Sequence, residues 1–215
     1  MAKPIIVCGI DFSGTSMVAG LLHHAGVDMG DVETADEVAA SDRSVRYLTY
    51  EDKGLLNRLR PLAQELYPLA PVVPDEWVNA LYHQFQAYCQ ERERKARGKR
   101  WGVKNNGLLF LSQHEQFANL PIQWVTTYRD DDDSLASCRQ KLGPEARCAE
   151  MMRAQWIALE LLYDRDPIEV NFHALLSYPK LTASLLFAEL GISSAPHAHT
   201  FIHPDTKGVI PCPGS

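Results

Sequence analysis

The chain has 215 residues, of which 46% are hydrophobic and 22% are charged, a balance typical of globular proteins and unlike that of disordered or fibrous chains. Its 21 Lys and Arg residues against 27 Asp and Glu residues give a formal net charge of −6, which argues against a nucleic-acid-binding protein that works through bulk positive charge. A local basic pocket for a small anion remains compatible with this balance. The length suits one domain with one hydrophobic core.

The five cysteines are scattered along the chain and include no CxxC pair, which is typical of a reduced protein and not of a disulfide framework or a zinc site. The apolar stretch near the N-terminus is too short for a signal peptide, and no run approaches the roughly 18 apolar residues of a membrane span. We therefore expect a cytoplasmic protein that binds neither a membrane nor nucleic acid. The cysteines are Cys8, Cys89, Cys138, Cys148 and Cys212.

Short β-branched runs alternate with longer helical patterns, which predicts an α/β fold: a three-layer sandwich whose helices cover a central, mostly parallel sheet. In chain order we predict a strand at 4–10, a helix at 14–25, a helix from Asp75 to just before Gly98, strands at 100–104 and 122–128, a helix at 144–163, a strand at 168–172 and a helix at 179–190. We expect one domain over residues 1–192 with a helical insert at about 31–98, followed by a Pro- and His-rich tail at 193–215.

The loop after the first predicted strand carries the strongest local signal. Residues 9–16 read Gly-Ile-Asp-Phe-Ser-Gly-Thr-Ser and have the spacing of a P-loop, with Thr15 where the lysine would stand. Glycines let such a backbone approach an anion, and the N–H groups that open the following helix point at it. Ser13, Thr15 and Ser16 would add hydroxyl donors. The alternative is a turn that needs its two glycines only for tight geometry.

Several later segments continue this pattern in a fixed order. They are YLTYED at 47–52, WGVKNN at 101–106, WVTTYRD at 124–130 with Ser137, and IEVNFHALLSYP at 168–179. Together with the loop and helix DFSGTSMVAGLL at 11–22, they resemble the P-loop sulfotransferase superfamily, particularly its bacterial branch, over roughly residues 4–192. The resemblance implies a P-loop NTPase-like fold of the sulfotransferase type.

Members of this superfamily transfer the sulfuryl group of 3′-phosphoadenosine 5′-phosphosulfate (PAPS) to a hydroxyl or an amine. The resemblance therefore implies a PAPS-dependent transferase that acts on a small-molecule or glycan acceptor. It also implies that Ser13, Gly14, Thr15 and Ser16 bind the 5′-phosphosulfate and that Arg129 and Ser137 bind the 3′-phosphate. A guanidinium suits phosphate because it forks onto two oxygens. For Arg129, an ion pair with the acidic run that follows it is the alternative.

Sulfuryl transfer also needs positive charge near the sulfuryl oxygens and a base for the acceptor proton. Lys104, at the end of a strand that we expect to be central, is the best candidate for the cation, and a solvated strand-end lysine is the alternative. Glu51 is the best candidate for the base. Its alternative is a carboxylate that is favoured by the dipole at a helix N-terminus.

Three departures from the superfamily pattern indicate a degenerate donor site. Phe12 replaces a basic residue of the loop, Asp130–Asp133 bring like charges beside the expected 3′-phosphate, and Asn171–His173 replace an R-Y-E segment. An aspartate run can coordinate Mg²⁺, but we favour the first turn of a helix and expect no metal. The alternative function is a non-catalytic or atypical P-loop nucleotide-binding protein, similar to a nucleotide kinase or NTPase.

Overall fold

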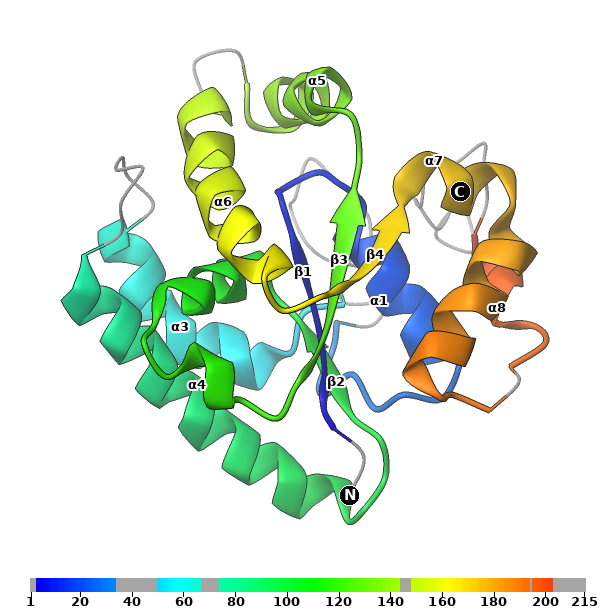
Figure 1. Ribbon diagram of the computed structural model, residues 1–215, viewed down its shortest axis with the longest axis horizontal. Coiled ribbons are helices and arrows are strands. Elements are labelled where there is room, and N and C mark those ends of the chain that lie inside the picture. The colour runs from blue at the N-terminus through cyan, green and yellow to red at the C-terminus, as the bar shows by residue number, and fades with distance from the viewer. Residues whose placement is uncertain (1–2, 34–49, 67–73, 144–147, 194, 203–215) are drawn as a thin grey trace.

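The computed structural model describes residues 3–33, 50–66, 74–143, 148–193 and 195–202 (Figure 1). Its centre is an all-parallel, four-stranded sheet with the strand order β2-β1-β3-β4. The strands are β1 (Ile5–Gly9), β2 (Gly102–Lys104), β3 (Gln123–Tyr128) and β4 (Ile168–Asn171). The predicted α/β fold with helices packed around a central parallel sheet is confirmed.

Helices cover both faces of this sheet. They are α1 (Thr15–His24), α3 (Lys53–Leu66), α4 (Asp75–Ala96), α5 (Asp131–Leu142), α6 (Cys148–Tyr163), α7 (Phe172–Ser177) and α8 (Pro179–Leu190). Three 3₁₀ segments, η1 (Asn106–Gln113), η2 (Phe117–Asn119) and η3 (Ala198–Phe201), complete the described elements. No helix in this part of the chain combines the length and the apolarity that crossing a bilayer demands.

The alternation of side chains along β1 divides the core into two clusters. Ile6 and Cys8 face the helices α3, α4 and α6 and the segment η1, whereas Ile5 and Val7 face α1, α8 and η3. The two groups of helices lie on opposite sides of the sheet (Figure 1). Because β1 is buried on both faces, its sequence is a continuous apolar run and not an alternating one.

Two of the predicted strands differ from the prediction. The last strand ends at Asn171, one residue early, because the Asn171 side chain accepts a hydrogen bond from the Ala174 N–H at 2.8 Å and so opens α7. The strand that ends at Lys104 lies at an edge of the described sheet and not in its centre. The predicted start of α6 at residue 144 falls outside the described residues.

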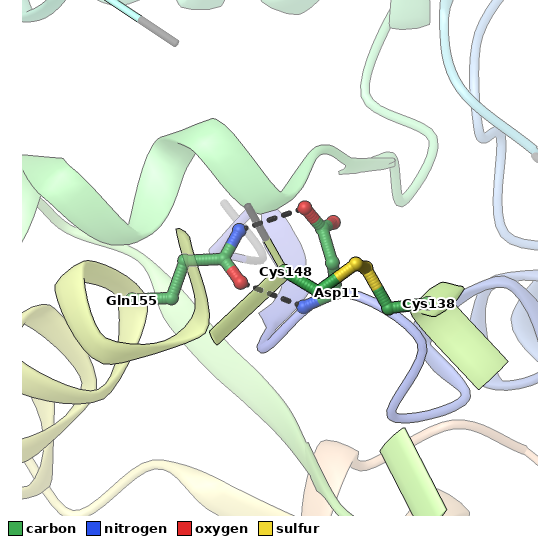
Figure 2. Close-up of a disulfide and its surroundings, with 4 residues drawn as sticks. All are labelled: Asp11, Cys138, Cys148 and Gln155. Carbon is green, nitrogen blue, oxygen red and sulfur yellow. Dashed lines mark hydrogen bonds between the residues drawn. A yellow bond between two sulfur atoms is a disulfide. The ribbon is translucent and has the colours of Figure 1, made fainter. Parts of the chain in front are cut away.

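The expectation of uniformly reduced cysteines is wrong for one pair. Cys138 on α5 and Cys148 on α6 form a disulfide with an S–S distance of 2.08 Å and a Cα–Cα distance of 6.0 Å (Figure 2). The two residues are 10 positions apart, and they meet because α6 packs back against α5. Short motifs such as CxxC carry no signal for a pair that only helix packing brings together. Cys8 and Cys89 are free thiols.

The described part of the predicted tail packs against the core through two buried residues. Ala198 and Ile202 are each 4% exposed and pack in the cluster that surrounds α1. Phe201 contacts the ring of His24, with their centroids 4.7 Å apart. His203 and the rest of the tail lie outside the described residues.

Candidate functional site

The first loop, residues 9–16, lies at the carboxyl edge of the parallel sheet and leads into α1. Gly14 is the N-cap of α1, with φ +102°, and a Cβ at this position would lie 2.4 Å from the Phe172 ring. Only glycine meets both conditions without strain. The first N–H groups of a helix have no partner within it and form the positive end of its dipole. The loop therefore has the backbone geometry of an anion site.

The loop hydroxyls predicted to bind the co-substrate differ in their surroundings. The Ser13 Oγ donates to the Ile10 carbonyl at 2.6 Å and lies 2.6 Å from the Thr127 Oγ1. Because Ser13 has one hydroxyl proton, Thr127 is the donor in the second contact. Ser13 and Thr15 are buried, and Ser16 is half-buried. The Ser13 side chain thus shapes the loop, while Ser16 is the more accessible hydroxyl.

The carboxylate of Asp11, near the start of the loop, is held by two amide side chains. The Gln155 Oε1 accepts from the Asp11 N–H at 2.8 Å, and the Gln155 Nε2 donates to the Asp11 Oδ2 at 2.9 Å (Figure 2). The Asn106 Nδ2 donates to the other oxygen, Oδ1. These hydrogen-bond donors stabilise the negative charge of the Asp11 carboxylate. An acidic residue is therefore compatible with an anion-binding loop.

Arg129 links the end of β3 to the first loop. Its Nη1 donates both to the Phe12 carbonyl and to the Ser137 Oγ, each at 3.1 Å. The guanidinium lies over the Phe172 ring, 4.6 Å from the centroid, and its buried Nε makes no hydrogen bond to the described residues. The structure thus brings together Arg129, Ser137 and the loop, the groups that sequence assigned to one co-substrate.

The acidic run Asp130–Asp133 forms the N-terminus of α5. Asp130 is its N-cap and accepts from the Asp132 N–H at 3.0 Å, which confirms the favoured interpretation as a first helical turn. The Trp156 Nε1 donates to Asp131 at 3.1 Å, and Asp133 lies 3.2 Å from the His173 Nε2. Asp133 is also 3.9 Å from the Arg129 Nε, so the alternative ion pair is present as a long contact. Within the described ranges, no three His, Cys, Asp or Glu residues are grouped to hold a metal ion.

The two candidate catalytic residues form an ion pair. The Lys104 Nζ lies 3.1 Å from the Glu51 Oε1, and their side chains are 8% and 22% exposed. Asp52 fixes this segment because its carboxylate accepts from the N–H groups of Asp31 and Leu55, both at 2.8 Å. The register pairs Lys104 with Val7 in the middle of β1, two residues before the first loop begins.

Sequence reasoning missed Gln155 and Asn106. Asn106 follows shortly after the WGVK segment, and Gln155 is a polar residue on the buried face of α6, near Met152 and Leu159. A glutamine in a core position of an amphipathic helix is a signal, because a buried amide requires partners. Nothing local identifies that partner, since Asp11 is 144 residues away.

A surface hollow of about 480 Å³ lies at the opposite end of the sheet from the first loop. Its basic residues lie in and just after the last turn of α4, where cations are favoured by the helix dipole. This hollow plays no part in the site. It is lined by Asp28, Arg94, Lys95, Ala96, Arg97 and Lys99.

No family model and no curated protein sequence matches the chain. Among solved structures, the sulfotransferase STF1 from Mycobacterium tuberculosis H37Rv is similar at 17% identity and a TM-score of 0.50, over 93% of this chain and 71% of that one. The sulfotransferase domain of the Synechococcus PCC 7002 olefin synthase is similar at 12% identity and a TM-score of 0.52, over 93% and 77%. A gluconokinase from Sinorhizobium meliloti 1021 has 13% identity and a TM-score of 0.45, over 90% and 98%. The chain has a P-loop fold of the sulfotransferase type.

Proposed function

We propose that this protein is a sulfotransferase-like nucleotide-binding protein that takes PAPS or its product, adenosine 3′,5′-bisphosphate. The first loop binds the 5′-phosphosulfate through the N–H groups of Gly14, Thr15 and Ser16, and Arg129 with Ser137 binds the 3′-phosphate. The acceptor is a hydroxyl or amine of a small molecule or glycan. The fold shared with two sulfotransferases supports the architecture, and the assignment of ligands is ours.

One observation carries the proposal: Arg129 donates to both Ser137 and the Phe12 carbonyl of the first loop. These contacts join the two halves of the expected donor site. The Arg129 side chain is only 13% exposed, so its charge acts at short range in a partly desolvated setting. A guanidinium carries five N–H donors, so these two bonds from one nitrogen do not use all of its donor capacity.

In the proposed transfer, the acceptor oxygen or nitrogen bonds to sulfur while the bond from sulfur to the 5′-phosphate oxygen breaks. The products are the sulfated acceptor, adenosine 3′,5′-bisphosphate and one proton. Glu51 receives that proton, and Lys104 stabilises negative charge on the sulfuryl and bridging oxygens. Since the two groups form an ion pair, bound ligands must compete for both.

The alternative, nucleotide binding without transfer, is favoured by a specific feature. Phe12 stands where the superfamily carries a basic residue, and Lys104 is already paired with Glu51. Loss of one key electrostatic donor costs about 3–4 kcal/mol of transition-state stabilisation. A kinase-like use of the aspartate run has less support, because Asp131 and Asp133 already have protein partners.

Isothermal titration with two isomeric nucleotides tests the donor site. Adenosine 3′,5′-bisphosphate and ADP have the same composition, and they differ in where the second phosphate lies. We expect the 3′,5′-isomer to bind more tightly, and Arg129→Gln to remove most of that preference. Arg153→Gln, which changes an exposed arginine on α6, is the matched control and should leave the preference intact. Equal affinity for the two isomers would remove the 3′-phosphate assignment.

Transfer is tested separately with radiolabelled PAPS and a panel of hydroxyl and amine acceptors. Binding with transfer that Glu51→Gln abolishes supports the enzyme. Binding with no transfer, and none gained in Phe12→Arg, supports the non-catalytic alternative.

A further inference from the structure

The first loop is held from two sides by helices that a disulfide joins. α5 starts two residues after Arg129, and α6 carries Gln155. The Cys138–Cys148 bond links the two helices next to these contacts (Figure 2). No sequence pattern indicates this link, and the proposed function does not use it.

From α6, Gln155 holds the start of the loop. Its side chain is fully buried and makes two hydrogen bonds to Asp11, one to the backbone N–H and one to the carboxylate. Displacing Gln155 would leave a buried amide and the Asp11 N–H without these partners, which is costly. The position of α6 therefore fixes the position of the backbone at residue 11.

From α5, Ser137 acts through Arg129. The Ser137 Oγ accepts from the Arg129 Nη1, and the same nitrogen donates to the Phe12 carbonyl. Ser137 is the residue before Cys138, so the disulfide lies beside this contact along the chain. The position of α5 therefore influences the backbone at residue 12.

These contacts close a ring. It runs from Asp11 to Gln155, along α6 to Cys148, across the disulfide to Cys138, and through Ser137 and Arg129 back to Phe12. Cys148 and Gln155 are seven positions apart on α6, or about two turns, and so share one face of the helix. The disulfide supplies the covalent cross-link of the ring, and hydrogen bonds supply its other side-chain contacts.

We propose that the Cys138–Cys148 disulfide controls the anion affinity of the first loop: the oxidised protein holds the loop in its binding shape, and reduction to two thiols weakens binding. This regulation rests on the proposed nucleotide site. In the step, a small dithiol reduces the bond, two protein thiols form, and the dithiol becomes a cyclic disulfide. Both sulfur-bearing residues are buried, so exchange is slow and each state persists.

The other described thiols do not compete for this exchange. Burial raises the pKa of the Cys8 thiol, and burial with the nearby Glu93 carboxylate raises the pKa of Cys89 to about 12. Both stay protonated at neutral pH, and a protonated thiol does not attack a disulfide. Reduction therefore breaks the Cys138–Cys148 bond, and Cys8 and Cys89 do not form new disulfides in its place.

Hydrogen exchange of a peptide covering residues 9–16, measured by mass spectrometry with and without dithiothreitol, tests the coupling without any ligand. We expect the loop to exchange faster after reduction. Titration with adenosine 3′,5′-bisphosphate should show a loss of affinity of about tenfold, within the usual range of coupling between two sites. The Cys138→Ser/Cys148→Ser variant should match the reduced protein and ignore dithiothreitol.

Gln155→Leu tests the hydrogen bonds between Gln155 and Asp11 separately from the disulfide. This variant keeps the bond, and we expect it to exchange faster at residues 9–16 even when oxidised and to lose most of its response to dithiothreitol. Gln86→Leu is the matched control, since Gln86 bonds Tyr82 on α4 and lies outside the ring. Far-UV circular dichroism confirms that each form is folded.

Unchanged loop exchange and unchanged affinity after reduction would overturn the proposal. If reduction unfolds the whole protein, oxidised Gln155→Leu decides instead, and unchanged exchange at residues 9–16 in that variant also overturns it. A response of the loop to dithiothreitol with no nucleotide binding in either state supports the coupling and refutes the proposed ligand.

Discussion

The Lys104 ammonium lies 3.1 Å from the Glu51 carboxylate, and both side chains are largely removed from water. The two residues come from segments 53 positions apart and join the start of α3 to the end of β2. Both have roles in the proposed transfer, so the pair connects stability with chemistry. Each charge holds the other in place.

Breaking this ion pair should lower the free energy of unfolding, and by a different amount for each of the two residues. Glu51→Gln leaves the Lys104 charge, whose side chain is 8% exposed, without its partner, whereas Lys104→Met leaves Glu51, which is 22% exposed and better hydrated. Because the pair is partly screened, we expect a loss of about 1–3 kcal/mol for Glu51→Gln and less for Lys104→Met. Urea unfolding measures both values.

The exposed pair between Lys53 and Asp31, with side chains 34% and 77% exposed, is the matched control. Asp31→Asn should change stability by about 0–1 kcal/mol. The double variant Lys104→Met/Glu51→Gln should recover part of the loss, since no buried charge is left alone. If the stability loss of the double variant equals the sum of the two single losses, the Lys104–Glu51 pair contributes no coupling energy.

Gly14 should tolerate no side chain. Gly14→Ala places a Cβ 2.4 Å from Phe172 and forces alanine to φ +102°, so backbone strain and overpacking of about 1–3 kcal/mol each combine. Gly26→Ala is the control, because Gly26 has φ +87° but no described atom lies within 4 Å of the place that an alanine Cβ would take, and only the strain applies. Thermal unfolding should show a clearly larger drop in melting temperature for Gly14→Ala than for Gly26→Ala. Equal drops in melting temperature would mean that the Phe172 contact is unimportant.

Cys8 and Cys89 should resist alkylation in the folded protein. Burial raises the pKa of both thiols, to about 12 for Cys89, so at about pH 8 almost none of either is the reactive thiolate. Iodoacetamide labelling followed by mass spectrometry should be slow in buffer and fast in urea. The same peptide map without reductant should contain a cross-linked peptide with Cys138 and Cys148. Rapid labelling of Cys89 in buffer would contradict the raised pKa of this half-buried thiol.

Asp28 should make the stability of the folded protein depend on pH in the acid range. Partial burial opposes ionisation, but hydrogen bonds from Arg92 and from the Gly30 N–H outweigh it and hold the pKa of Asp28 below 3.8. A lowered pKa in the folded state adds stability above the unfolded pKa, and that contribution is lost as the pH falls through the folded value. Asp28→Asn should therefore be less stable than the wild type at about pH 7, with a difference that shrinks below about pH 4. A difference that stays constant from neutral pH into this acid range would rule out the linkage.

The sequence was sufficient for the sheet and for most of the helices on it. Strand β1 is recognisable as an apolar run, and α8 begins and ends at the predicted residues because Pro179 opens it and Gly191, at φ +65°, ends it. The order of the segments that contain Lys104 and Arg129 also identified which strand ends approach the loop. These signals are local, and they act through backbone preference and periodicity.

What the sequence did not reveal depends on contacts between distant residues. The hydrogen bonds between Gln155 and Asp11 join residues that are 144 positions apart, and the disulfide requires α6 to pack on α5. The placement of Lys104 on an edge strand follows from the strand order, which periodicity does not encode. The roles of the predicted site residues remain predictions until a ligand is bound.

A crystal structure of the oxidised protein soaked with adenosine 3′,5′-bisphosphate is the decisive experiment for the proposed donor site. We predict the 5′-phosphate on the N–H groups of Gly14, Thr15 and Ser16 and the 3′-phosphate within hydrogen-bond distance of Arg129 and Ser137. A nucleotide bound elsewhere, or one that reaches the first loop while its 3′-phosphate points away from Arg129, would contradict the assignment.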